Sequence, residues 1–254
     1  MVFIPLHDDK ALDNIGFHWV NITLILANVA IWLIGGAIVT GTNTATAVSF
    51  TYGFIPSVAN DLKVLPAQYD LLPDYASYLT YAFFHADFWH LAGNMLFLWV
   101  FGDNVEDAMG HIRYLIFYLL CAAAAAYFHG FVFQTSDSPL IGASGAASGV
   151  VGAYLMLHPK VKVWVLVLSR IPLRLPALWL LGGWAAYQII MFVVDSDGNV
   201  SWAAHVGGIV AGLVLVVVFK KRSVPLFDRD YVEPDATERT SRTTPKTTQP
   251  WGRQ

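Results

Sequence analysis

Six apolar stretches, separated by more polar segments, constrain the fold of this chain more than any other feature. They cover residues 17–39, 88–101, 113–132, 144–157, 177–194 and 202–219. A helix crosses a membrane with roughly 20 mostly apolar residues. Hydrophobic residues make up 56 % of the chain and charged residues only 13 %, which is too apolar for an ordinary soluble domain. We therefore predict an all-α polytopic membrane protein with six transmembrane helices.

The segments between the apolar stretches differ in kind. Residues 40–79 mix Gly, Thr, Asn, Pro and Tyr, and we predict a long outer loop with structure of its own. Residues 160–176 are too short to span and are bracketed by Lys and Arg, which indicates an interfacial segment. Residues 223–254 hold few large apolar side chains and are predicted to be a disordered cytoplasmic tail. The predicted membrane domain is residues 1–222.

The positive charges predict the topology, because Lys and Arg concentrate in cytoplasmic segments. With the N-terminus inside, the outer segments hold only Lys63. The inner segments then hold Lys10, Arg113, Lys160, Lys162, Arg170, Arg174, Lys220, Lys221 and Arg222. Both termini are therefore expected in the cytoplasm. The first stretch lacks a small-residue cleavage site, and no organelle-targeting segment is visible, so we expect a retained first span and a bacterial plasma (inner) membrane.

Composition also excludes several classes of protein. The net charge of −3 gives no indication of nucleic acid binding. The single cysteine, Cys121, excludes an intrachain disulfide and a cysteine metal site. His85 and His90 are five residues apart and diverge around a helix, and no His-Glu-x-x-His motif is present, so we expect no metal. No cofactor is expected.

Three of the apolar stretches carry polar side chains at one depth. At ~1.5 Å per residue from the inner end of each stretch, Ser144, His90 and His205 lie roughly 20–22 Å above the inner boundary. Polar groups inside a membrane are costly and indicate function by default. The helix that starts at Ser144 is also shorter than the membrane core, so its free N–H groups need a water-filled cavity. Hydrolysis needs such a cavity as well.

These side chains fit the chemistry of a serine hydrolase. A serine hydroxyl becomes a nucleophile when a base takes its proton, and a neutral histidine such as His205 can do so. Small residues around His205, including Gly208, can dock on Gly145 and Gly149 and bring Ser144 close. No acidic residue lies near that depth on either stretch, so we expect a Ser–His dyad rather than a triad.

A hydrolase also needs donors for the oxyanion of its tetrahedral intermediate. The helix start at Ser144 offers a backbone N–H and the positive end of the helix dipole. His90 and Asn94 are four residues apart, hence on one helix face, and can add side-chain donors.

Each of these residues also has a purely structural interpretation. Ser144 can be a helix N-cap or a small packing residue. His90 and His85 can be structural hydrogen-bonders, and Asn94 can join two helices. The run around Ser144 is not a nucleophile elbow, because that motif wants Gly two residues after the serine and Ala146 stands there.

The motifs together resemble the rhomboid intramembrane serine proteases. They are Gly142-Ala143-Ser144-Gly145, Ala204-His205-x-x-Gly208, His85-x-x-x-x-His90-x-x-x-Asn94, Phe101-Gly102 and Glu106. The resemblance covers residues 17–219. It implies Ser144 as nucleophile, His205 as base, and His90, Asn94 and the Ser144 N–H as the oxyanion site. It also implies substrates that are themselves transmembrane segments, cut near the outer face. We further expect these substrates to be single-span proteins in the lipid bilayer.

Two positions depart from the family's pattern. Many members have Trp-Arg in the first outer loop, and Ala76-Ser77 stands here, which questions how the loop docks on the membrane. Some members carry Tyr four residues after the nucleophile, stacked on the catalytic histidine, and here that residue is Ser148. Another contact must then orient His205.

Two other functions remain open from the residues. One is a non-catalytic rhomboid-like membrane adaptor that binds transmembrane helices. The inactive relatives lose the serine or the histidine, whereas this chain keeps both Ser144 and His205. The other is a small transporter with a polar midplane site, although transporters tend to show internal repeats and none is visible here.

Overall fold

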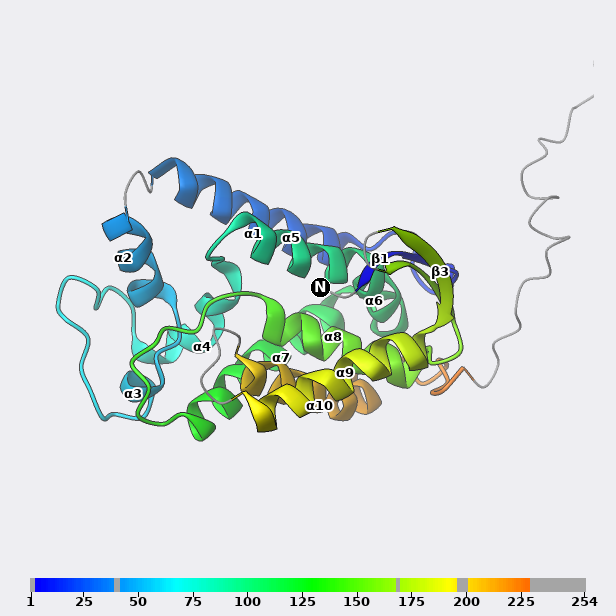
Figure 1. Cartoon of the computed structure of the whole chain (residues 1–254). Helices are drawn as coiled ribbons and strands as arrows, with labels where there is room; N and C mark the ends of the chain where they lie inside the picture. Colours follow the sequence, from blue (N-terminus) through cyan, green and yellow to red (C-terminus); the bar gives the residue numbers. More distant parts are fainter. Residues whose placement is uncertain (1–2, 39–41, 168–169, 196–200, 229–254) are drawn as a thin grey trace, which may run out of the picture.

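The computed structural model describes residues 3–38, 42–167, 170–195 and 201–228, and most of them are helical. Each of the six apolar stretches forms a helix (Figure 1). The helices are α1 (Trp19–Ile38), α5 (Phe88–Phe97), α7 (His111–Val132), α8 (Ser144–Leu157), α9 (Ala177–Val194) and α10 (Trp202–Phe219). By length and composition α7, α9 and α10 can each cross a membrane, whereas Trp19–Gly35 and α8 are shorter apolar helices.

The second stretch is widened by a π-helical turn. α5 continues through η3 (Leu98–Gly102) into α6 (Asp103–Met109). The Asn21 side chain of α1 donates to the Leu98 carbonyl at 2.8 Å, so the polar group of the irregular turn is satisfied. At the start of α1, the buried Glu106 carboxylate accepts from the backbone N–H groups of Val20 and Asn21. These bonds join α1 to the second stretch.

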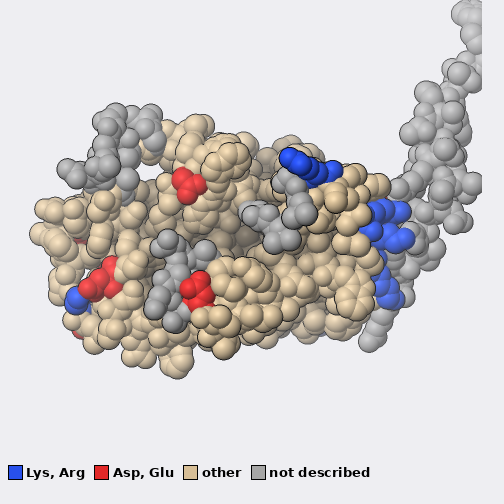
Figure 2. Space-filling model, in the orientation of Figure 1, with Lys and Arg blue, Asp and Glu red and all other residues tan. Residues whose placement is uncertain are grey.

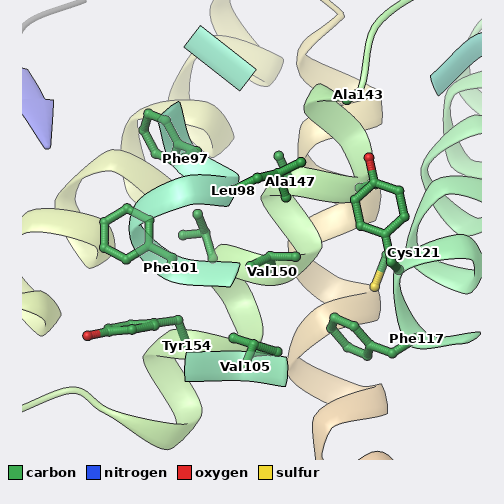
Figure 3. Close-up of a cluster of buried hydrophobic side chains, with 14 of the residues drawn as sticks. Phe97, Leu98, Phe101, Val105, Phe117, Cys121, Ala143, Ala147, Val150 and Tyr154 are labelled. Atoms are coloured by element: carbon green, nitrogen blue, oxygen red, sulfur yellow. The ribbon is translucent and has the colours of Figure 1, made fainter. Parts of the chain in front are cut away.

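α8 lies at the centre of the molecule and packs against α7 and α10. Small residues allow this close approach. A methyl group at Gly208 would lie 2.0 Å from the Gly145 carbonyl oxygen, and one at Gly212 would lie 1.9 Å from that of Gly149. On another side α8 packs its apolar side chains against the second stretch, with Phe97, Leu98 and Phe101 close to Ala147, Val150 and Tyr154 (Figure 3). This packing holds the start of α8 in one place.

The segment before α8 is tied to the long loop after α1. That loop contains α2 (Thr42–Tyr52), α3 (Pro56–Ala59), η1 (Asp74–Ala76), α4 (Ser77–Thr80) and η2 (Tyr81–Phe83). Phe54 forms an antiparallel bridge with Leu140, and Gly142 donates its N–H to the Tyr81 carbonyl at 2.9 Å. The loop, predicted to have structure of its own, therefore frames the start of α8.

A three-stranded antiparallel sheet adds to the predicted helical fold. It is formed by β1 (Phe3–Asp8), β2 (Lys162–Val167) and β3 (Ile171–Pro176), in that order. The stretch predicted as an interfacial segment is thus a β-hairpin, paired with the N-terminal strand. Val163 and Val165 of β2 are fully buried on one face, as the period of two in a strand requires.

The predicted boundary of the tail at residue 223 is wrong for its first residues. Val224 and Asp228 are buried, and the N–H groups of Phe227 and Asp228 donate to the carbonyls of Met156 and Leu157. The Asp228 carboxylate accepts from the Lys160 N–H at 2.7 Å and lies 3.0 Å from His158 Nδ1. Composition does not predict this folded segment, because its side-chain bonds come from a single buried carboxylate, that of Asp228. The rest of the predicted tail, residues 229–254, lies outside the described residues.

Candidate active site

A cavity of about 1500 Å³ opens between the helices and collects the polar side chains that the sequence singled out. Ser144, His205, His90 and Asn94 all line it. The face of the molecule in Figure 2 is hollowed between α5 and α9, the two elements that supply much of the lining. The polar side chains thus lie on the wall of a largely apolar, open cavity between the helices.

Ser144 is the first residue of α8. The helix cap is Ala143, without a side-chain cap bond, so the interpretation of Ser144 as an N-cap is wrong. Gly142 has a φ of +117°, which disfavours any other residue. A methyl group there would lie 2.5 Å from His90 Cε1, so the imidazole packs directly against the Gly142 backbone. The turn that carries Ser144 is therefore in contact with His90.

His85 links two parts of the site. The Ala143 N–H donates to His85 Nε2 at 3.3 Å, and Asn94 Nδ2 lies 3.0 Å from the same nitrogen. Because Nε2 accepts from the backbone, the Asn94 amide is the donor to it. The amide has two N–H groups, so one remains for the cavity. His85 thus makes structural bonds at the site.

The helices α8 and α10 bring the serine and the histidine to one place. Gly145 lies against Gly208, and the Ala204 carbonyl oxygen lies 3.6 Å from where a Gly145 methyl group would stand. Ser144 and His205 are the chain neighbours of Gly145 and Ala204. Both side chains are partly exposed, and both face the cavity.

His205 has a partner that the sequence analysis missed. Its Nδ1 lies 2.8 Å from Oε1 of Gln188 on α9, and the Trp202 ring and the imidazole form a T-shaped pair with their centroids 6.0 Å apart. Ser148, the residue at the family's tyrosine position, instead donates to the Ser144 carbonyl at 2.6 Å. The signal for Gln188 was available, because it is a lone amide in an otherwise apolar span.

A second serine and histidine also meet at this cavity. Ser201 Oγ, just before α10, lies 2.7 Å from His129 Nδ1 in the last turn of α7. This contact joins the ends of two helices. His129 was not singled out, although it too is an ionisable residue inside an apolar stretch.

Fold and cavity together define a helical, multi-span membrane protein with hydroxyl, imidazole and amide groups gathered between its helices. Comparison with known proteins then gives the family. Residues 73–222 match the model of the Rhomboid domain, and the chain belongs to the rhomboid family. The predicted recognition and the predicted class of helical, multi-span membrane protein are thereby confirmed. The number of six spans stays a prediction.

The chain is similar to several curated rhomboid proteins. It is 25 % identical to the rhomboid protease AarA of Providencia stuartii, over 83 % of this chain and 75 % of that protein. It is 26 % identical to the rhomboid protease GlpG of Haemophilus influenzae, over 54 % of this chain and 66 % of that protein. It is 29 % identical to the mitochondrial rhomboid protein 1 of Saccharomyces cerevisiae, over 60 % of this chain and 44 % of that protein. The chain thus spans less than half the length of the mitochondrial relatives it matches.

Proposed function

We propose that the chain is an intramembrane serine endopeptidase that works with a Ser144–His205 dyad. The observation that carries the proposal is the shared cavity of a serine at a helix start and a histidine on the helix packed against it. The family includes proteases, among them the AarA and GlpG relatives, which supports the same reaction class here.

The reaction proceeds in two steps. His205 takes the Ser144 proton while Oγ attacks the substrate carbonyl carbon, and the tetrahedral oxyanion collapses to an acyl-enzyme as the amine leaves with that proton. Water from the cavity then hydrolyses the ester by the same route. The oxyanion accepts hydrogen bonds from the backbone N–H at Ser144 and from the free N–H of Asn94, and His90 is a further donor.

The substrates in this proposal are transmembrane segments of single-span proteins. A helical peptide bond hides its carbonyl in a hydrogen bond, so a cut is favoured where Gly or another weak helix former lets the helix open. The cavity is lined by α5 and α9, and α9 keeps many apolar side chains exposed, which supports access beside α9.

We propose that both termini lie in the cytoplasm and that the membrane is a bacterial inner membrane. Figure 2 shows Lys and Arg gathered at the end of the molecule that carries the sheet. At the other end, Lys63 pairs with Asp137. This asymmetry follows the positive-inside rule.

Purified protein in proteoliposomes tests the proposal with a single-span substrate and a fluorophosphonate probe. Ser144→Ala is expected to abolish both cleavage and labelling, and His205→Ala to reduce them to background. Ser223→Ala is the matched control, at an exposed serine outside the cavity lining, and is expected to retain both signals. Cleavage at near-normal rate in either site variant would refute the dyad. Absence of cleavage and labelling in the unaltered chain would favour the adaptor.

A further inference from the structure

Gln188 has no role in the reaction as described so far, yet it is the only amide side chain in α9. Its exposed fraction is 3 %, so its polar head lies in the protein interior. A buried amide costs free energy unless its donors and acceptor are paired. The hydrogen-bond partners of the Gln188 amide therefore show which neighbouring group it fixes in place.

The hydrogen bonds of Gln188 determine which way its amide points. Nε2 lies 3.4 Å from the Trp184 carbonyl oxygen, one turn earlier in α9. A carbonyl can only accept, so the NH₂ group faces Trp184 and Oε1 faces His205. Oε1 can only accept as well, and it lies 2.8 Å from His205 Nδ1. Nδ1 must then carry a proton.

A proton on Nδ1 leaves the lone pair of the neutral imidazole on Nε2. That is the state a general base needs when its other nitrogen is held by an acceptor. The Trp202 contact restricts the ring plane at an interplanar angle of 87° but cannot distinguish the two nitrogens. A hydrogen bond to one of the two nitrogens does distinguish them.

We propose that Gln188 is the positioning residue that fixes the tautomer and orientation of His205, so that Nε2 receives the Ser144 proton. This inference rests on the proposed protease function. During the attack the proton moves from Ser144 Oγ to Nε2, and the Nδ1–H stays with Gln188. Gln188 thus supplies a contact that orients His205 in a chain that has Ser148 at the tyrosine position.

The two partners lie on different helices. Gln188 belongs to α9, whose exposed side chains include Ile189, Ile190 and Val193, and His205 belongs to α10. The base is therefore oriented only while α9 packs against α10, which links substrate access beside α9 to catalytic competence.

Two substitutions test the role of the acceptor. Gln188→Leu keeps the side-chain volume but removes the acceptor, whereas Gln188→Glu keeps an acceptor. In proteoliposomes we expect kcat to fall about 10- to 100-fold in Gln188→Leu, because a misplaced catalytic group costs about that much. KM should stay within about twofold. Gln188→Glu should recover most of the rate, and Ile190→Ala, a lipid-exposed change on the same helix, should match the unaltered chain.

A spectroscopic measurement keeps the test independent of how well a Gln188 variant folds. With ¹⁵N-labelled histidine, and His205→Ala for assignment, the ring of His205 in the unaltered chain should show a protonated Nδ1 and an unprotonated Nε2. The reverse pattern would overturn the inference without any Gln188 variant. So would a normal kcat in a folded Gln188→Leu. Cleavage that survives Ser144→Ala would instead refute the protease proposal itself.

Discussion

At the scale of single residues, the candidate site is built from groups whose hydrogen bonds are only partly used. Asn94 is buried to an exposed fraction of 8 %, and one of its two N–H groups binds His85. The other is available to an oxyanion. His90 is held against Gly142, where even a methyl group would collide with the imidazole. Small changes at these positions should therefore affect the reaction more than the fold.

Asn94→Ala tests the oxyanion role. Loss of one donor typically lowers kcat about 10²–10³-fold, and the backbone N–H at Ser144 remains, so we expect weak but measurable cleavage. Steady-state kinetics in proteoliposomes measures it. A normal kcat with a raised KM would instead assign Asn94 to substrate binding.

At the scale of elements, the contact between α8 and α10 positions the two proposed catalytic residues. Backbone meets backbone there, since the Gly145 carbonyl touches Gly208 and the Gly149 carbonyl touches Gly212. A rigid carbonyl cannot move aside as the end of a flexible side chain can. The same glycines therefore determine both packing and the separation of Ser144 from His205.

Gly208→Ala is expected to separate these helices. The added methyl group would stand 2.0 Å from the Gly145 carbonyl oxygen, and overpacking of this kind costs about 1–3 kcal/mol. Thermal unfolding in detergent should show a lowered Tm, and cleavage should fall with it. Gly182→Ala on α9 is the control. Its added methyl group would meet only Leu178, at 3.9 Å, so Tm and cleavage should both be retained. Equal behaviour of the two variants would contradict the tight contact.

At the scale of the whole molecule, both ends of the described chain are anchored at the end that carries the sheet. Asp8 of β1 accepts from Tyr154 Oη and from Asn104 Nδ2, and the latter bond is 2.9 Å long. Asp228 is held by His158 and Lys160. Two carboxylates, the part-buried Asp8 and the buried Asp228, thus hold the N-terminal and C-terminal segments against the membrane helices.

Asp8 should make this end of the molecule sensitive to pH. Burial raises the pKa of its carboxyl to about 6, more than its hydrogen bonds lower it. The folded state therefore favours the protonated form, and the stability this contributes is lost as the pH rises from about 4 through about 6. Tm should fall less over this range in Asp8→Asn than in the unaltered chain. Asp13→Asn, at an exposed carboxylate, is the control, and an equal fall in all three chains would contradict the argument.

A truncation tests where the folded domain ends. A chain that stops after Asp228 should keep full cleavage and Tm, because the anchoring bonds remain. A chain that stops after Phe227 leaves His158 and the Lys160 N–H without that carboxylate and should lose stability by about 1–3 kcal/mol. Cleavage assays and thermal unfolding compare the two. Loss of activity in the longer chain would assign a role to residues 229–254.

The helices and much of the candidate site could be predicted from sequence. Apolar stretches near membrane length must be helical, because lipid offers no partner for backbone N–H and C=O groups. The α8, α9 and α10 boundaries follow the predicted stretches closely. Ser144, His205, His90 and Asn94 stood out because polar groups are costly at that depth, and they do line one cavity.

Only the tertiary structure decided which polar groups pair. The bonds of His205 to Gln188, His129 to Ser201 and Asp228 to His158 join separate segments of the chain. The sheet likewise pairs β1 with a hairpin far away in sequence. A hydrogen bond tolerates a variation of only a few tenths of an ångström in the distance between donor and acceptor. Hydrophobic pattern determines that helices form and which residues are costly to bury, but the packing of one helix on another determines their partners.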